Sequence, residues 1–206
     1  MTLVRGATHY DRAYFDKWYR HPAHRVKSAR YLERQAAFVV AVTEYLLERR
    51  ITSVLDVGAG EGHWRPALRR RRPGLRYYGV DPSEYAVRRY GRRRNIRLGS
   101  LGDLHRLRLP GAFDLVLCCG VLNYVADDEI EAGLRTLRKM ARGPLYLEIF
   151  AREDDAEGDF KRHAAKPGAW YRDVIRRAGL VACGLHFYVP RELRHLTSAL
   201  ERGGGR

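Results

Sequence analysis

Residues 54–62 read VLDVGAGEG, and this stretch decides the fold. Its first half is a short apolar run of the kind that forms a buried strand. Its second half carries glycines at positions 58, 60 and 62, which allow the backbone to approach a ligand closely. A helical pattern follows at once, and a helix N-terminus offers free N–H groups to an anion. The stretch therefore predicts a nucleotide site at a strand-to-helix turn.

The glycine spacing indicates which nucleotide is bound. The dinucleotide fingerprint has its third glycine one position later, where this chain has His63. Asp81 ends the next predicted strand, residues 76–81, and follows the glycines by about 20 residues. A carboxylate at that place accepts hydrogen bonds from a ribose diol. The pattern thus favours a nucleoside ligand other than a dinucleotide.

Residues 56–62 (DVGAGEG) followed by residues 80–83 (VDPS) resemble the first two motifs of the class I S-adenosylmethionine-dependent methyltransferases. The resemblance implies methyl transfer as the activity and S-adenosylmethionine as the cofactor. It also implies an α/β, Rossmann-like, doubly wound sheet that is mostly parallel, with strand order 3-2-1-4-5 plus an antiparallel edge strand and helices on both faces. The alternation of predicted strands and helices along the chain agrees with this fold class.

Length and composition narrow the possible domain organisation and cellular compartment of the protein. A chain of 206 residues is expected to form one domain with a proper core. No apolar run approaches the roughly 20 residues that a membrane helix needs, and the first residues lack the apolar core of a signal peptide. The three cysteines do not form a disulfide framework, which favours a reducing cytoplasm. We predict no metal site, and the sequence leaves the oligomeric state open.

We expect an N-terminal aromatic arm or lid over residues 1–29, a single methyltransferase domain over 30–202 and a disordered tail over 203–206. The C-terminal part shows one strand pattern, residues 180–189, followed by a short helix over 191–201. The sheet of the family that the chain resembles has two strands there. The sequence therefore predicts a reduced C-terminal edge.

Cofactor residues are expected at the carboxyl ends of the strands, where open α/β sheets bind ligands. The resemblance gives Asp56 the role of orienting the methionine part, and it lets Leu101 pack on the adenine and Asp103 accept from its amino group. The alternative for Asp103 is a turn residue or helix cap. Arg25 is a candidate for the cofactor carboxylate. The predicted cofactor-binding residues are Asp56, Gly58, Ala59, Gly60, Gly62, Asp81, Pro82, Ser83, Leu101, Gly102, Asp103, Cys119, Gly120, Tyr14 and Arg25.

The predicted catalytic residues are His163, His186 and Glu148. Methyl transfer from a sulfonium is an in-line displacement in which positioning supplies much of the acceleration. A base helps when the acceptor is a hydroxyl or a charged amine. The two histidines and Glu148 are the candidates for this base.

The acceptor is predicted to be a small molecule that is neutral or cationic, methylated on an oxygen or nitrogen atom. Acidic residues gather between positions 148 and 159, after the fifth strand, and the N-terminal aromatics could cover the same mouth. A net charge of +15 raises the alternative of an rRNA or tRNA methyltransferase. The arginine runs at 69–72 and 88–94 speak against nucleic acid, because we expect them at the opposite edge of the sheet. A non-catalytic, methyltransferase-like binding module is the third possibility.

Overall fold

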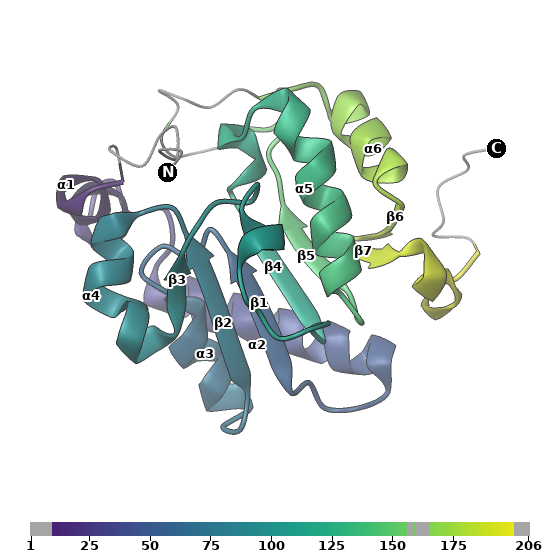
Figure 1. Ribbon diagram of the computed structural model, residues 1–206, viewed down its shortest axis with the longest axis horizontal. Helices are drawn as coiled ribbons and strands as arrows, with labels where there is room; N and C mark the ends of the chain where they lie inside the picture. The colour runs from purple at the N-terminus through teal and green to yellow at the C-terminus, as the bar shows by residue number, and fades with distance from the viewer. Residues whose placement is uncertain (1–9, 156–158, 160–164, 200–206) are drawn as a thin grey trace.

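A computed structural model describes residues 10–155, 159 and 165–199. Its centre is a seven-stranded sheet with the order β3-β2-β1-β4-β5-β7-β6, in which β1 to β5 are parallel and β7 runs antiparallel to both of its neighbours (Figure 1). The predicted Rossmann-like fold is confirmed. The strands are β1 (Ser53–Val57), β2 (Arg76–Asp81), β3 (Ile96–Leu98), β4 (Leu115–Cys119), β5 (Leu145–Glu148), β6 (Leu180–Gly184) and β7 (Phe187–Pro190).

The described residues form six α-helices. They are α1 (Arg12–Phe15), α2 (Ala29–Leu47), α3 (Trp64–Arg71), α4 (Glu84–Arg94), α5 (Asp127–Met140) and α6 (Gly168–Arg177). A π-helical turn (Asp16–Arg20) continues α1, and 3-10 turns lie at Leu104–Arg106, Leu122–Tyr124 and Arg191–Leu196. None of the helices in the described part of the chain is long and apolar enough to cross a membrane.

Two apolar cores hold the layers together. One lies between the sheet and α5 with α6, and Leu55, Val116 and Leu134 are among its buried members. The other lies between the sheet and α2 with α3, and it contains Val39 and Leu68. Figure 1 shows α5 in front of the sheet and α2 behind it. Burial on both faces explains why β4 (LVLCC) is a continuous apolar run in the sequence.

The C-terminal edge is a hairpin, so the prediction of one strand over residues 180–189 was wrong. The chain turns at Leu185 and His186, whose φ angles are 51° and 67°. Side chains disfavour this left-handed region, and hairpin turns that use it are usually marked by Asn or Gly. Because neither Leu185 nor His186 is a typical turn residue, the sequence shows no break between the two strands. The sheet therefore has both C-terminal strands, with β7 inserted between β5 and β6.

One element near the C-terminus also differs from expectation. The helix predicted over residues 191–201 is a 3-10 turn that ends at Leu196 within the described residues. At the start of α2, the side chain of Ser28 caps the helix by accepting from the backbone N–H of Tyr31.

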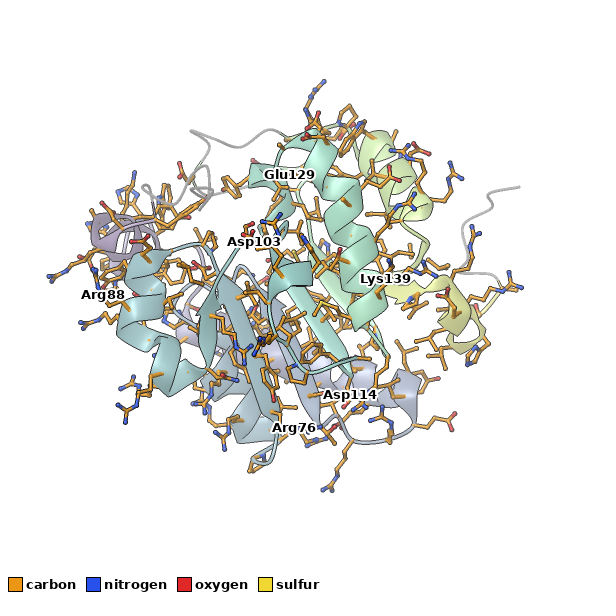
Figure 2. All side chains as sticks on the ribbon, viewed as in Figure 1. Arg76, Arg88, Asp103, Asp114, Glu129 and Lys139 are labelled. Carbon is orange, nitrogen blue, oxygen red and sulfur yellow. The ribbon has the colours of Figure 1, made fainter. Side chains whose placement is uncertain are left out.

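The amino edge of the sheet is closed by the buried carboxylate of Asp114. It accepts hydrogen bonds from Arg49 and Arg142 and from the backbone N–H groups of Thr52 and Ser53. Asp114 thereby joins the start of β1 to the segment that leads into β4. Figure 2 shows Asp114 and Arg76 together at this end of the molecule.

Candidate active site

The glycine loop after β1 lies against the end of β2. Gly58 and Gly60 adopt φ angles of 74° and 54°, which favour glycine. A Cβ atom on Gly60 would lie 2.5 Å from the hydroxyl of Tyr19. The backbone N–H of Gly60 donates to Asp81 at 2.6 Å, and the other oxygen of Asp81 accepts from Ser83 N–H at 2.9 Å. One carboxylate thus fixes both the loop and the first turn of α4.

A cavity of about 790 Å³ opens above this loop, between the ends of β1, β2, β3 and β4. Its volume is in the range typical of ligand pockets. Asp81 lies on one wall, and Leu101 and Asp103 come from the segment after β3. Figure 2 shows Asp103 and Glu129, another lining residue, at the end of the sheet opposite Arg76 and Asp114. We call this space the cofactor cavity.

A second cavity, of about 430 Å³, lies on the α2 and α3 side of the strand ends. It shares six lining residues with the cofactor cavity, so the two spaces adjoin. Glu148 and Asp56 line the second cavity alone, together with aromatic side chains from several segments. We call it the acceptor cavity. The shared residues are Tyr14, Tyr19, Gly58, Cys119, Gly120 and Tyr124.

Buried carboxylates at the strand ends have altered acidity. Burial raises the pKa of Asp56 to about 7, although the hydroxyl of Tyr77 donates to it and opposes the shift. Burial likewise raises the pKa of Asp81 to about 6, against the two backbone N–H groups that it accepts. Carboxyl groups that lie in a cleft and have a pKa near neutral pH are typical of functional sites.

Phenols at the junction of the two cavities stay protonated at neutral pH. Burial raises the pKa of Tyr124 to about 12, and it raises those of Tyr14 and Tyr19 above their ordinary value as well. Burial also raises the pKa of the Cys119 thiol well above its usual range. These four groups therefore act as hydrogen-bonding or packing groups rather than as bases.

The N-terminal segment from Tyr10 to Arg20 packs directly on the glycine loop. Phe15 is 2% exposed and stacks on Tyr85 of α4. Arg20 forms an ion pair with the buried side chain of Glu61, and Ser83 donates to the backbone carbonyl of Tyr10. The segment is thus attached to the glycine loop, to Ser83 at the end of the second motif and to α4.

Most predicted cofactor residues gather around the cofactor cavity. The ten that line it are Tyr14, Gly58, Gly60, Asp81, Pro82, Leu101, Gly102, Asp103, Cys119 and Gly120. Asp56, Ala59 and Arg25 line the acceptor cavity instead. Gly62 and Ser83 line neither space, and Ser83 caps α4 by accepting from the N–H of Ala86. Asp103 accepts from the N–H and the hydroxyl of Ser100, which is the turn geometry that was its alternative reading.

The three candidate bases have different positions. Glu148 ends β5 and lines the acceptor cavity. His186 lies in the β6–β7 turn, 5.9 Å between ring centroids from Tyr146, and it lines neither cavity. His163 lies outside the described residues. Among the three, the described structure brings only Glu148 to the site.

The acidic segment after β5 does not form the expected wall of carboxylates. Glu153 accepts from the N–H of Gly168 at the start of α6, and Asp154 accepts from the N–H of Ala151. Neither residue lines the acceptor cavity, whereas Asp159 does. Carboxylates in such segments satisfy local backbone donors, which is a common use of Asp and Glu near helix starts.

The arginine runs are not confined to the far edge of the sheet, so this expectation was wrong. Arg70 lines the acceptor cavity and pairs with Glu33 of α2. Arg94 donates to the backbone carbonyl of Glu61 in the glycine loop. Both reach the site because α3 and α4 are short and an arginine side chain is long. Arg88, by contrast, lies on the outer side of α4 (Figure 2).

Several site residues carried no recognisable signal in the sequence. Lys27 stands in the segment before α2 and forms an ion pair with Glu148. Trp64, the first residue of α3, lines the acceptor cavity although its helical pattern marks it only as core. Its place directly after the glycine loop was the one available hint. Lys27 could be found only from the fold, because its partner is 121 residues away.

The cofactor cavity fits S-adenosylmethionine by its chemistry. The glycine loop brings backbone within reach of a ligand, and Asp81 supplies a buried carboxylate for a ribose diol. Leu101 supplies an apolar wall for a base. Bound there, the cofactor would supply an activated methyl group on a sulfonium centre. The residues present are therefore compatible with this group.

Comparison with known proteins points the same way. Residues 55–143 match the family described as "Methyltransferase domain". Magnesium protoporphyrin IX methyltransferase from Synechocystis PCC 6803, solved with bound SAH, is 21% identical, with 85% of this chain and 89% of that chain covered and a TM-score of 0.63.

Two further solved structures share the fold. CalS10 from Micromonospora echinaspora, an amino pentose methyltransferase solved with bound SAM, is 17% identical over 80% of this chain and 91% of its own, with a TM-score of 0.60. DesVI from Streptomyces venezuelae is 15% identical over 77% and 92%, with a TM-score of 0.59. No curated protein matches the sequence. Residues 55–143 thus resemble a methyltransferase domain, and the chain shares the fold of these S-adenosylmethionine-dependent methyltransferases.

Proposed function

We propose that the protein transfers the methyl group of S-adenosylmethionine to an oxygen or nitrogen atom of a small molecule. The observation that carries the proposal is the pair of adjoining cavities. The cofactor cavity carries the ribose-binding carboxylate, and the acceptor cavity meets it at Gly58, Cys119 and Gly120. A methyl group held at this junction faces an acceptor in the second cavity, as an in-line displacement requires.

The size of the acceptor cavity supports a small-molecule acceptor. Its volume of about 430 Å³ is in the range of pockets that hold compounds of drug size. Magnesium protoporphyrin IX methyltransferase and the amino pentose methyltransferase, both similar in fold, are named for small-molecule substrates. A nucleotide within RNA would have to leave its stack to reach the same space.

We assign the cofactor to the residues around the first cavity. The N–H groups of the glycine loop lie beside the methionine part, and Asp81 accepts from the ribose. Leu101 packs against the adenine. Tyr14 and the rest of residues 1–29 act as a lid, a role supported by the burial of Phe15 and by the ion pair between Arg20 and Glu61. Residues 30–202 form the catalytic domain beneath this lid.

We further propose a reducing cytoplasm as the place of action. No disulfide bond joins the three cysteines, all of which lie in the described part of the chain, and Cys118 is fully buried. Free cysteines without a disulfide framework are typical of a reducing compartment.

The experiment has two stages. Calorimetry on the full chain measures the binding of S-adenosylmethionine, its demethylated product and NAD, and we expect micromolar affinity for the first two alone. Methyl-labelled cofactor is then incubated with a metabolite extract and, separately, with total RNA. Label in the metabolite fraction supports the proposal, and label in RNA would establish the nucleic-acid alternative. Tight cofactor binding without transfer to either pool would favour the non-catalytic module.

A further inference from the structure

Aromatic rings form much of the acceptor cavity. Trp18 and Tyr19 come from the N-terminal segment, Trp64 from the start of α3, and Tyr124 and Phe150 from the segments after β4 and β5. These rings come from four different parts of the chain, so the fold assembles the aromatic surface rather than one local pattern. Flat ring systems pack well against such walls, through offset or edge-to-face contacts.

The charged side chains of this cavity mostly neutralise one another. Glu33 pairs with Arg70, and Glu148 pairs with Lys27. Burial holds the pKa of Asp56 at about 7, so that this carboxyl is partly protonated near neutrality. Two further charged residues of opposite sign, Arg25 and Asp159, complete the lining, together with His63. The walls therefore offer no surplus of negative charge to select a cation.

The ion pair of Lys27 and Glu148 lines this aromatic space and offers a hydrogen-bond donor beside an acceptor. The ammonium of Lys27 contacts Glu148 and also donates to Gln35 at 3.2 Å. The amide of Gln35 donates to Glu148 and to the hydroxyl of Tyr146, both at 3.0 Å. A hydroxyl group can donate to the carboxylate and accept from the ammonium at once. A ligand ammonium can only donate, and a ligand carboxylate can only accept.

The pair lies next to the junction of the two cavities. Glu148 is the register partner of Cys119 on the neighbouring parallel strand, and Cys119 lines both cavities. Neighbouring strands are about 4.8 Å apart, and paired residues project to the same face of the sheet. The carboxylate of Glu148 therefore lies one strand away from the place where a methyl group would cross.

We propose that the acceptor is a planar aromatic hydroxyl compound, a phenol, whose ring packs against these aromatic walls and whose hydroxyl binds the Lys27–Glu148 pair. The inference rests on the proposed methyltransferase function and names its substrate class. Glu148 takes the hydroxyl proton, and the ammonium of Lys27 donates a hydrogen bond to the hydroxyl oxygen and orients it. The bond that forms joins the phenol oxygen to the methyl carbon. The bond that breaks is methyl to sulfur, its electron pair stays on sulfur as a neutral thioether, and the proton leaves Glu148 for solvent.

Three naphthalene probes of different charge test this proposal on the full chain saturated with S-adenosylhomocysteine. They are 2-naphthol, the 2-naphthylmethylammonium ion and 2-naphthoate, which share one ring system. We expect calorimetry to give a Kd for 2-naphthol at least tenfold lower than those of the two ions. Equal or tighter binding of either ion would overturn the proposal, as would a failure of 2-naphthol to bind.

Variants then identify the binding group. Lys27→Met and Glu148→Gln should each weaken 2-naphthol about tenfold and abolish its methylation by labelled cofactor, and Lys27→Arg should restore part of both. Lys139→Met is the matched control, because Lys139 lies on α5 and lines neither cavity (Figure 2). An unchanged affinity for S-adenosylhomocysteine verifies that each variant is folded. Normal 2-naphthol binding by both Lys27→Met and Glu148→Gln would overturn the assignment.

The two proposals fail in different ways. If the wild-type chain does not bind S-adenosylhomocysteine, the proposed function fails and this inference fails with it. If the wild type binds S-adenosylhomocysteine but prefers a charged probe, the methyltransferase function stands and only the phenol is wrong.

Discussion

The carboxylate of Asp81 accepts a 2.6 Å hydrogen bond from the backbone N–H of Gly60, so the acid that ends β2 closes directly on the glycine loop after β1. The two residues belong to separate sequence motifs, 21 positions apart. Pairing of β1 with β2 in parallel register, Val57 opposite Val80, brings these motifs together. The carboxylate of Asp81, for which we propose contact with the ribose, is thereby held in place by the glycine loop.

Asp81→Ala should weaken S-adenosylmethionine binding by one to two decades. The loss of a charged hydrogen-bonding group costs about 1.5–3 kcal/mol, which corresponds to that change in Kd. Calorimetry provides the measurement, and circular dichroism verifies the fold. Asp173→Ala, on α6 and outside both cavities, is the control and should bind normally. A dissociation constant unchanged in Asp81→Ala would mean that the carboxylate serves the loop alone.

Cofactor affinity should rise with pH. Burial raises the pKa values of Asp56 and Asp81 to about 7 and about 6, so both carboxyl groups ionise across this window. S-adenosylmethionine carries a sulfonium and an ammonium group, and ionised carboxylates favour cations. We expect the Kd to fall as the pH rises from 5.5 to 8, and Asp56→Asn to flatten this dependence. A pH-independent Kd in the wild type would contradict the prediction.

The raised pKa of Asp56 should also make the stability of the ligand-free protein depend on pH. A carboxyl whose folded pKa exceeds its unfolded value, about 3.9, binds protons more tightly when folded. Stability is therefore lost as the pH rises from about 4 towards 7. Asp56→Asn should show a smaller loss over this range in urea titrations. If both proteins lose the same free energy of unfolding, Asp56 is not the group responsible.

The contribution of Asp114 to stability should have the opposite pH dependence, because it is lost as the pH falls. The guanidinium groups of Arg49 and Arg142 and the N–H of Thr52 hold its pKa well below its usual range, against the effect of burial. Its contribution is full above the unfolded pKa of about 3.9 and is lost as the pH falls below it. Asp114→Ala orphans two backbone donors, which costs about 1–3 kcal/mol for each buried one.

At neutral pH we therefore expect Asp114→Ala to lower Tm by at least about 4 °C, given roughly 2–4 °C per kcal/mol for a chain of this size. Its acid limb below pH 4 should also be shallower than that of the wild type. Glu131→Ala, which removes exposed ion pairs with Arg135 and Arg177, is the control and should change Tm little. Equal effects of the two substitutions would refute the role of Asp114 as a clamp.

Phe15→Ala should release the N-terminal segment without unfolding the domain. Phe15 contacts Tyr19 and Tyr85, and Tyr19 in turn lies against Gly60. We expect trypsin to cleave after Lys17 or Arg20 faster than in the wild type, and S-adenosylhomocysteine to dissociate faster, with a small change in Tm. Phe187→Ala, in the core beside α2, is the contrast and should lower Tm strongly. Unaltered cleavage in Phe15→Ala would show that other contacts hold the segment.

The sequence by itself determined the sheet, the cofactor and most of the cofactor cavity. Strand and helix periods are local properties, and the helix cap Ser83 acts within a few residues of its own position. Ten predicted residues line one cavity because the carboxyl ends of parallel strands must meet at one edge. The prediction of one strand over residues 180–189 failed for a local reason too. The turn there is formed by Leu185 and His186, which are not typical turn residues.

Only the tertiary structure decided what the second cavity is made of. Lys27 and Glu148 are 121 positions apart, and Arg70 reaches Glu33 from a different helix. Glu153 and Asp154 looked like part of the mouth, yet they are bound to nearby backbone donors. Which charges face a ligand depends on which are already paired across the fold, and pairing between distant segments leaves no periodic pattern in a single sequence.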